Sequence, residues 1–297
     1  MSYRIVRVRG LVQGVGFRPY VWRLARELGL KGWVRNDGAG VTIAVDGEKV
    51  GEFLARLPLE LPPLARIDGV DVETSADRHS CESENPEGKP GSDHDFHILE
   101  SESSQVQTAI GPDAAICPAC IADLCNPASR RWRYAFTTCT HCGPRYTVSS
   151  GIPYDRARTS LAGFPLCAPC DAEYRDPADR RFHAETTCCP DCGPQLRLLA
   201  ENGQEIAVDR KNCPKTAPDP LSATLALLRA GKIVAIKGLG GFHLACDADN
   251  ATVVAELRRR KGREAKPFAV MALNAASVAD IADITPAAEA LLSSTAA

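Results

Sequence analysis

Four Cys-x-x-Cys pairs in the middle of this 297-residue chain give its clearest chemical signal. A Cys-x-x-Cys turn brings two thiolates to one metal ion, and a second turn completes a tetrahedral site. The pairs are Cys117/Cys120, Cys139/Cys142, Cys167/Cys170 and Cys189/Cys192. Their spacing predicts two structural zinc ions, each closed by four thiolates with no coordination position left for catalysis.

The cysteine pairs belong to an internal duplication. Cys167 follows Cys117 by 50 residues, and the same offset relates Arg130-Arg131 to Arg180-Arg181 and Gly143-Pro144 to Gly193-Pro194. The duplication favours two sequential sites, 117/120/139/142 and 167/170/189/192, while the spacing alone also allows interleaved pairing. Disulfides are the alternative that a reducing compartment disfavours. The remaining cysteines fit no pair: Cys81, Cys125, Cys188, Cys213 and Cys246.

A second chemical signal is the segment Gln13-Gly14-Val15-Gly16-Phe17-Arg18. The two glycines let the backbone curl so that several N–H groups converge, and a helix that begins after them adds positive potential. Together these features predict an anion site suited to phosphate. Arg18 can bind phosphate oxygens in a bidentate manner, and the neutral amide of Asn36, one strand later, can position a water molecule.

The elements around this loop follow a recognisable order. Alternating apolar residues predict strands, and apolar residues at helical spacing predict two helices. The predicted elements are a strand at Tyr3–Arg9, a helix from Pro19 to Leu28, a hairpin of Gly32–Asp37 and Val41–Val45, a helix at Val50–Leu57, a strand at Ile67–Glu73, a loop at Ser75–His94 and a closing strand at Asp95–Glu100. This βαββαβ order predicts a ferredoxin-like antiparallel sheet with two helices on one face.

The last hundred residues are predicted to be mixed α/β. We expect a helix from Pro218 to Leu228, a strand at Ile233–Ile236, a helix at Asn250–Arg260 and a strand at Lys266–Met271. The glycine-rich turn between Gly238 and Gly241 does not match a dinucleotide-binding fingerprint.

Composition excludes several functions. The net charge of −2 gives no reason to expect wholesale nucleic-acid binding. No signal peptide and no membrane-spanning run is found, so we expect a cytoplasmic protein. The segment Arg130–Phe136 mixes basic and aromatic residues, and we interpret it as core-forming aromatics with solvated arginines. His141 and His183 are expected to pack or to face solvent instead of binding metal.

The string Val12-Gln-Gly-Val-Gly-Phe-Arg18, with Asn36 about one strand later, resembles acylphosphatases. The resemblance implies that Arg18 and the loop amides bind the phosphoryl group of an acyl phosphate, and that Asn36 orients the attacking water. Farther along, Lys237–Leu244, Asp247, Arg260–Arg263 and Lys266–Phe268 resemble the start of YrdC-type nucleotide-binding domains. That likeness implies contacts from Lys237, Lys261, Arg263 and Lys266 to ATP phosphates or a small anion.

An acylphosphatase domain (1–102), a double four-cysteine module (103–200) and the start of a YrdC-like domain (201–297), in this order, resemble HypF-type carbamoyltransferases, which mature NiFe hydrogenases. The implied architecture is α+β and multidomain. The implied reactions are hydrolysis of carbamoyl phosphate, synthesis of carbamoyl-AMP from ATP, and transfer of the carbamoyl group to the C-terminal cysteine of a HypE-type partner, as a precursor of a cyanide ligand. The chain ends within the YrdC-like region, so hydrolysis is the step that it is expected to perform.

Two other functions compete with this interpretation. One is a generic acylphosphatase fused to zinc fingers, and the other is a zinc-ribbon module that binds nucleic acid or protein. Because four-thiolate sites are closed, we expect the cysteine module to be a rigid joint between the two reactive domains and to take no part in their chemistry.

Overall fold

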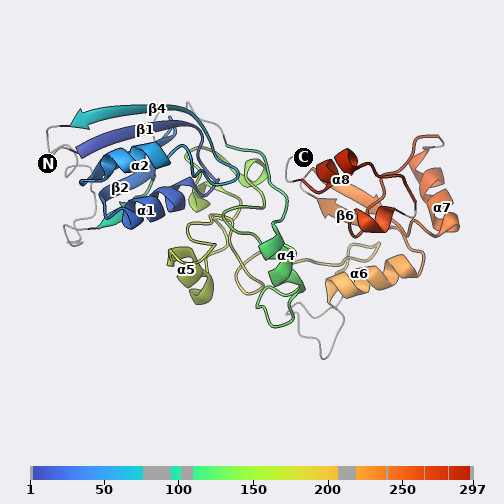
Figure 1. Cartoon of the computed structure of the whole chain (residues 1–297). Coiled ribbons are helices and arrows are strands. Elements are labelled where there is room, and N and C mark those ends of the chain that lie inside the picture. Colours follow the sequence, from blue (N-terminus) through green and yellow to red (C-terminus); the bar gives the residue numbers. More distant parts are fainter. Residues whose placement is uncertain are drawn as a thin grey trace. The chain divides into compact units, whose positions relative to one another are not determined.

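The computed structural model describes residues 3–75, 95–101, 110–206, 219–238, 240–263, 265–279 and 281–294. The chain divides into two compact units, Met1–Gly193 and Pro194–Ala297, and the first contains both the N-terminal sheet and the cysteine-rich module (Figure 1). Apart from Ser75 itself, the loop predicted at Ser75–His94 lies outside the described residues. Across the described ranges, no helix is both long and apolar enough to cross a membrane.

A five-stranded sheet forms the N-terminal domain, with strand order β4-β1-β3-β2-β5. The strands are β1 (Tyr3–Leu11), β2 (Lys31–Asn36), β3 (Val41–Asp46), β4 (Arg66–Ser75) and β5 (Phe96–Ile98). The predicted ferredoxin-like order is confirmed. The sheet is mixed, however, and not purely antiparallel, because β5 runs parallel to β2 at the edge, with Gly32 opposite Phe96.

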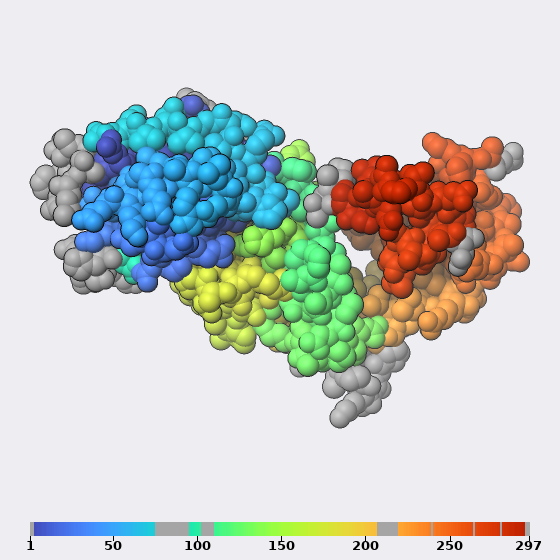
Figure 2. All heavy atoms as spheres, viewed as in Figure 1, coloured from blue at the N-terminus to red at the C-terminus, as the bar shows by residue number. Residues whose placement is uncertain are grey.

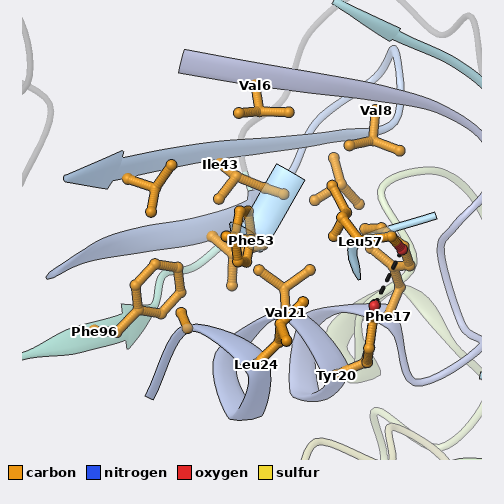
Figure 3. Packing of buried hydrophobic residues seen from close by; sticks show 14 of the residues in the cluster. Val6, Val8, Phe17, Tyr20, Val21, Leu24, Ile43, Phe53, Leu57 and Phe96 are labelled. Atoms are coloured by element: carbon orange, nitrogen blue, oxygen red, sulfur yellow. Dashed lines mark hydrogen bonds between the residues drawn. The ribbon is translucent and has the colours of Figure 1, made fainter. Parts of the chain in front are cut away.

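Helices α1 (Phe17–Glu27) and α2 (Val50–Arg56) pack on the apolar side chains of this sheet. Figure 3 shows Val21 and Leu24 of α1 directed toward Ile43 of β3, with Phe53 of α2 beside them. All four side chains are buried, as alternating strand positions and helical spacing require. This packing fixes the start of α1, and with it the glycine loop that joins β1 to α1.

The cysteine-rich module contains little regular structure. Helices α4 (Pro118–Cys125) and α5 (Ala168–Arg175) each begin directly after a cysteine, and two short 3₁₀ helices lie at Tyr146–Val148 and Arg156–Arg158. A small apolar cluster includes Tyr134, Val148, Leu161 and Cys188, with Phe136 packed against it. The aromatic residues therefore supply core, as predicted, and Figure 2 shows the module lying against the sheet domain within the first unit.

The second unit contains α6 (Pro220–Arg229), a hairpin of β6 (Val234–Gly238) and β7 (Gly241–Ala245), α7 (Ala251–Lys261) and α8 (Pro286–Leu292). The strand predicted at Lys266–Met271 is wrong. Its residues pair with no strand in the described part of this unit, and the Lys266 carbonyl instead accepts a hydrogen bond from Arg258 Nη1 of α7 at 3.1 Å. Pro267 also lacks the N–H that a ladder needs.

Replacing Phe53 by alanine tests the core that positions the glycine loop. The side chain is 0% exposed, so Phe53→Ala should lower the free energy of unfolding of the first unit by about 3–5 kcal/mol. Chemical denaturation followed by tryptophan fluorescence measures this loss, since Trp22, Trp33 and Trp132 all lie in the first unit. Leu59→Ala is the control, because Leu59 is 80% exposed and its removal should change stability by less than about 0.5 kcal/mol. Equal effects of the two substitutions would contradict the packing described here.

Candidate active site and metal centres

The glycine loop is built as an anion nest between β1 and α1. Gly14 and Gly16 have φ values of 70° and 77°, in the left-handed region that favours glycine. Gly16 is the N-cap of α1 and supplies no side-chain cap, so N–H groups of the first turn remain available to a ligand. The side chains of Val15 and Phe17 are buried in the core. These residues can therefore contribute only backbone groups to the site.

Gln13 holds the loop in place and has no side-chain capacity left for phosphate. Its amide nitrogen donates to the carbonyls of Asp37 and Gly40 at 2.7 and 2.8 Å. Its amide oxygen accepts the Tyr154 N–H at 3.0 Å. Gln13 thus ties the loop to the β2–β3 turn and to the cysteine module.

Arg18 and Asn36, the two predicted catalytic residues, line one pocket. Arg18 lies in the first turn of α1, and Asn36 ends β2. Asn36 is 1% exposed; its amide nitrogen donates to the Tyr154 carbonyl at 3.5 Å, and its Oδ1 has no hydrogen-bond partner in the described structure. A buried acceptor without a partner is costly, so this oxygen is available to accept a hydrogen bond from a ligand or a water molecule.

The cysteine module supplies the opposite wall of this pocket, which sequence reasoning missed. Arg145, Tyr154 and Glu185 line it. Arg145 Nε donates to the Gly14 carbonyl, and the same guanidinium binds the carbonyls of Cys142 and Thr140 at 2.7 and 2.9 Å. The module therefore does more than join two domains, because it forms part of the pocket that holds both predicted catalytic residues. The sequence feature that could have indicated this contact is the string Tyr154-Asp155-Arg156, because neither metal site requires its polar residues.

The guanidinium of Arg18 meets two carboxylates of the module. Arg18 Nη2 donates to Asp155 Oδ1 at 2.9 Å and to Glu185 Oε1 at 2.8 Å. Burial acts to lower the pKa of Arg18, but Glu185 and Asp155 raise it above its ordinary value. Burial raises the pKa of Glu185, and Asp155 adds to this rise while Arg18 opposes it. Arg18 is therefore a permanently charged group that is buried in the pocket wall.

The eight predicted metal ligands form two separate clusters, and their grouping is sequential: Cys117, Cys120, Cys139 and Cys142 in one, and Cys167, Cys170, Cys189 and Cys192 in the other. Within each cluster the Sγ atoms lie within 4.8 Å of one another, and Cys167 and Cys189 are 3.6 Å apart. Zn–S bonds of about 2.3 Å give tetrahedral edges of about 3.8 Å, whereas a disulfide needs about 2.05 Å. The spacing fits a tetrahedral metal ion and excludes disulfides at these cysteines.

Each cluster lies in one half of the duplicated module, the first finger (residues 116–149) or the second finger (residues 166–199). Each cluster receives arginines from the other finger. Arg130 Nη2 donates to Cys170 Sγ at 3.2 Å, and Arg180 Nη1 donates to Cys120 Sγ at 2.8 Å. Arg131 pairs with Glu173 at 2.6 Å and is 2% exposed. The expectation that these arginines are solvated was wrong for Arg131, because the thiolates and Glu173 supply the negative charge that permits its burial.

The other candidate ligands lie outside the clusters. His183 packs between Tyr174 and Phe182, with ring centroids 4.9 and 4.7 Å apart. Cys188 lies in the apolar cluster, where it accepts a hydrogen bond from Tyr134 Oη at 3.5 Å. Both therefore have packing roles, as predicted for His183.

The four predicted nucleotide-binding residues lie in the second unit. Lys237 of β6 has its Nζ 5.6 Å from the centroid of the Phe242 ring. Arg263 stacks on Phe268 at 5.8 Å, Lys261 ends α7, and Lys266 follows after the turn. Lys261, Arg263 and Lys266 share one basic segment, whereas Lys237 lies on the hairpin.

Comparisons with known proteins agree with this arrangement. Family models match for Acylphosphatase at residues 4–84, for the HypF finger at 116–149 and 166–199, and for the Sua5, YciO and YrdC family, described as Telomere recombination, at 226–297. An acylphosphatase of Caldivirga maquilingensis is 50% identical over 72 residues, which cover 23% of this chain and 75% of that protein. The fold and the site thus define an acylphosphatase-type domain joined to paired metal fingers.

Longer relatives identify the family. Carbamoyltransferase HypF2 of Cupriavidus necator is 56% identical over 291 residues, which cover 97% of this chain and 34% of that protein. A crystal structure of full-length HypF in the phosphate- and nucleotide-bound form matches with a TM-score of 0.84 and 38% identity, over 99% of this chain and 36% of that one. The chain belongs to the HypF carbamoyltransferase family and corresponds to its N-terminal portion, about a third of the length of these relatives.

The pKa of His183 provides a test of the pocket's electrostatics. Burial, assisted by the nearby charge of Arg18, lowers it from 6.5 to about 3. His183 should therefore stay neutral in the folded chain from pH 8 down to about pH 4. The unfolded chain binds this proton below about pH 6.5, so the contribution of His183 to stability is full above that pH and is lost as pH falls toward 3. Side-chain NMR titration of His183 measures the pKa. Arg18→Ala should raise it, and an unchanged value in that variant would contradict the assigned cause.

Proposed function

We propose that the first unit hydrolyses an acyl phosphate at the pocket formed by the glycine loop, Arg18 and Asn36. The observation that carries this proposal is the buried, unpartnered Oδ1 of Asn36 in the same pocket as a buried guanidinium. An anion nest and a guanidinium suit a phosphoryl group, and a buried acceptor suits a water molecule.

The residues act by position and charge. Loop N–H groups and Arg18 bind the phosphoryl oxygens and stabilise the charge that develops on them. Asn36 Oδ1 accepts a hydrogen bond from water and directs the water oxygen toward phosphorus. As the new P–O bond forms, the bond from phosphorus to the acyl oxygen breaks. The products are a carboxylate or carbamate, hydrogen phosphate and one proton.

Family membership extends the proposal to a substrate. In HypF proteins we infer that the acyl phosphate is carbamoyl phosphate, and that this cytoplasmic reaction supplies carbamate for carbamoyl-AMP synthesis from ATP in the YrdC-like region. Lys237, Lys261, Arg263 and Lys266 would contact nucleotide phosphates there. Transfer to a HypE-type partner cysteine would follow in the full-length protein. A matched structure, that of full-length HypF, is named as phosphate- and nucleotide-bound, which supports both ligand classes.

The two cysteine clusters are proposed to hold one zinc ion each. Four thiolates close the coordination sphere, so the ions would support the fold without activating water. The apolar cluster around Tyr134 is small. Metal binding would therefore supply most of the free energy that stabilises the module.

Substitution of the two catalytic residues tests the hydrolysis. Arg18→Ala should lower kcat/KM for carbamoyl phosphate by about a hundredfold or more, because it removes the charged donor to the phosphoryl group. Asn36→Ala should lower kcat by about a hundredfold with little change in KM, because water is no longer oriented. Release of inorganic phosphate measures both effects. Arg26→Ala is the control, since Arg26 lies on the same helix but pairs with Asp95. Equal rates for wild type and Arg18→Ala would end the proposal.

Metal analysis tests the clusters. Mass spectrometry of the native chain should find two zinc ions. Cys139→Ser should leave one ion and destabilise the module, whereas Cys125→Ser should retain both, because Cys125 is exposed and outside either cluster. Chelation should unfold the module, because the free energy of metal binding no longer contributes to folding. Finding one ion or none in the native chain would contradict the assigned ligand sets.

A further inference from the structure

The carboxylate of Glu185, in the second finger, is placed to control the geometry of Arg18. Its side chain is 4% exposed, and its Oε1 accepts the 2.8 Å hydrogen bond from Arg18 Nη2. Its Oε2 accepts from Tyr174 Oη and from the Arg156 N–H, both at 3.0 Å. Donors on both oxygens fix the carboxylate in position and orientation.

The same contacts leave donors of Arg18 for a ligand. A guanidinium carries five N–H groups, and the two on Nη2 meet Asp155 and Glu185. Nη1 has only a long contact of 3.5 Å to Ser101 Oγ, and Nε has no acceptor among the described residues. Nη1 can therefore donate to a phosphate oxygen while Nη2 stays bound to the finger.

A phosphate that displaced Glu185 from Arg18 would leave a buried carboxylate without its cation. Breaking such a pair is strongly unfavourable, since the remaining charge stays desolvated. Oε2 would also remain held by Tyr174 and Arg156. Phosphate is therefore expected to bind beside the Arg18–Glu185 pair without displacing Glu185 from Arg18.

The internal duplication separates this role from a structural one. At the offset of 50 residues, Ala135 of the first finger is equivalent to Glu185, and Leu124 is equivalent to Tyr174. The first finger forms its four-cysteine cluster without either polar group. The Glu185–Tyr174 pair is therefore not needed to build a finger, and it occurs in the copy that contacts Arg18.

We propose that Glu185, anchored by Tyr174, is a positioning residue of the acyl phosphate site: it acts across the domain boundary to hold Arg18 with its Nη1 donors toward the phosphoryl group. The proposal rests on the proposed hydrolysis for its catalytic meaning. The binding of phosphate by an oriented Arg18 can be measured separately, without any turnover of substrate.

Inorganic phosphate, titrated into the full chain and followed by ³¹P NMR, is the direct probe. Glu185→Gln should weaken phosphate binding by about tenfold, because an amide cannot accept from Arg18 and from the two donors at Oε2 together. In the Arg18→Ala background this effect should disappear. There Glu185 has no guanidinium to hold, so Glu185→Gln should leave phosphate binding unchanged. Tighter phosphate binding by Glu185→Gln in the otherwise native chain would show competition and overturn the proposal.

Tyr174→Phe gives a second variant that alters no charge at neutral pH. It removes one anchor of Glu185 and should weaken phosphate binding in the same direction by about threefold. Asp171→Asn is the matched control, because it neutralises a carboxylate on the same helix that pairs only with the exposed Arg175; phosphate binding should not change. Metal content and thermal unfolding establish that each variant is folded. If Glu185→Gln does not fold, Tyr174→Phe decides, and native-like phosphate binding by it would refute the positioning role.

Turnover of carbamoyl phosphate separates this proposal from the one on which it rests. A wild-type chain that binds phosphate but hydrolyses no acyl phosphate would end the proposed function, while the binding results would still judge Glu185. With active wild type, Glu185→Gln should lower kcat/KM by about tenfold or more and should have no further effect in the Arg18→Ala chain.

Discussion

The burial of one positive charge, that of Arg18, governs the organisation of the first unit. A guanidinium whose side chain is 9% exposed needs an anionic partner, because its hydration has been lost. The sheet domain places Arg18 in the first turn of α1, and the cysteine module brings Asp155 and Glu185 to it. The site therefore depends on two structural parts that are held together across its pocket.

Charge compensation also stabilises the cysteine module. Four thiolates around a divalent cation carry a net charge of about −2, which a small module cannot leave buried without compensation. The duplicated arginines provide that compensation reciprocally, since Arg130 reaches Cys170 and Arg180 reaches Cys120. Each finger thus completes the surroundings of the other finger's cluster. The same docking brings Glu185 and Arg145, one from each finger, to the pocket beside the glycine loop.

Local patterns predicted the elements and the chemistry that lies close together in sequence. Alternation predicted β1 to β3, and helical spacing predicted α1 and α2. The Cys-x-x-Cys pairs predicted all eight ligands, and the internal duplication favoured the sequential grouping that the structure shows. The carboxylates of Asp155 and Glu185 could not be predicted in the same way, because they meet Arg18 only through tertiary docking over 137 and 167 residues of chain. The apolar run at Lys266–Met271 was misjudged for a related reason: a strand requires a partner, and its own sequence does not reveal one.

Comparison of the two fingers separates the residues of the cysteine clusters from residues of the pocket. Positions shared at the offset of 50 residues include the cysteines, the paired arginines and their acidic partners Asp123 and Glu173, all of which lie in or beside the clusters. Positions that differ include Arg145 against Gln195 and Ala135 against Glu185. Arg145 holds the Gly14 carbonyl, and Glu185 holds Arg18. The duplicated scaffold thus presents two unlike residues to one pocket, because Arg145 and Glu185 both line it and neither has a counterpart in the other finger.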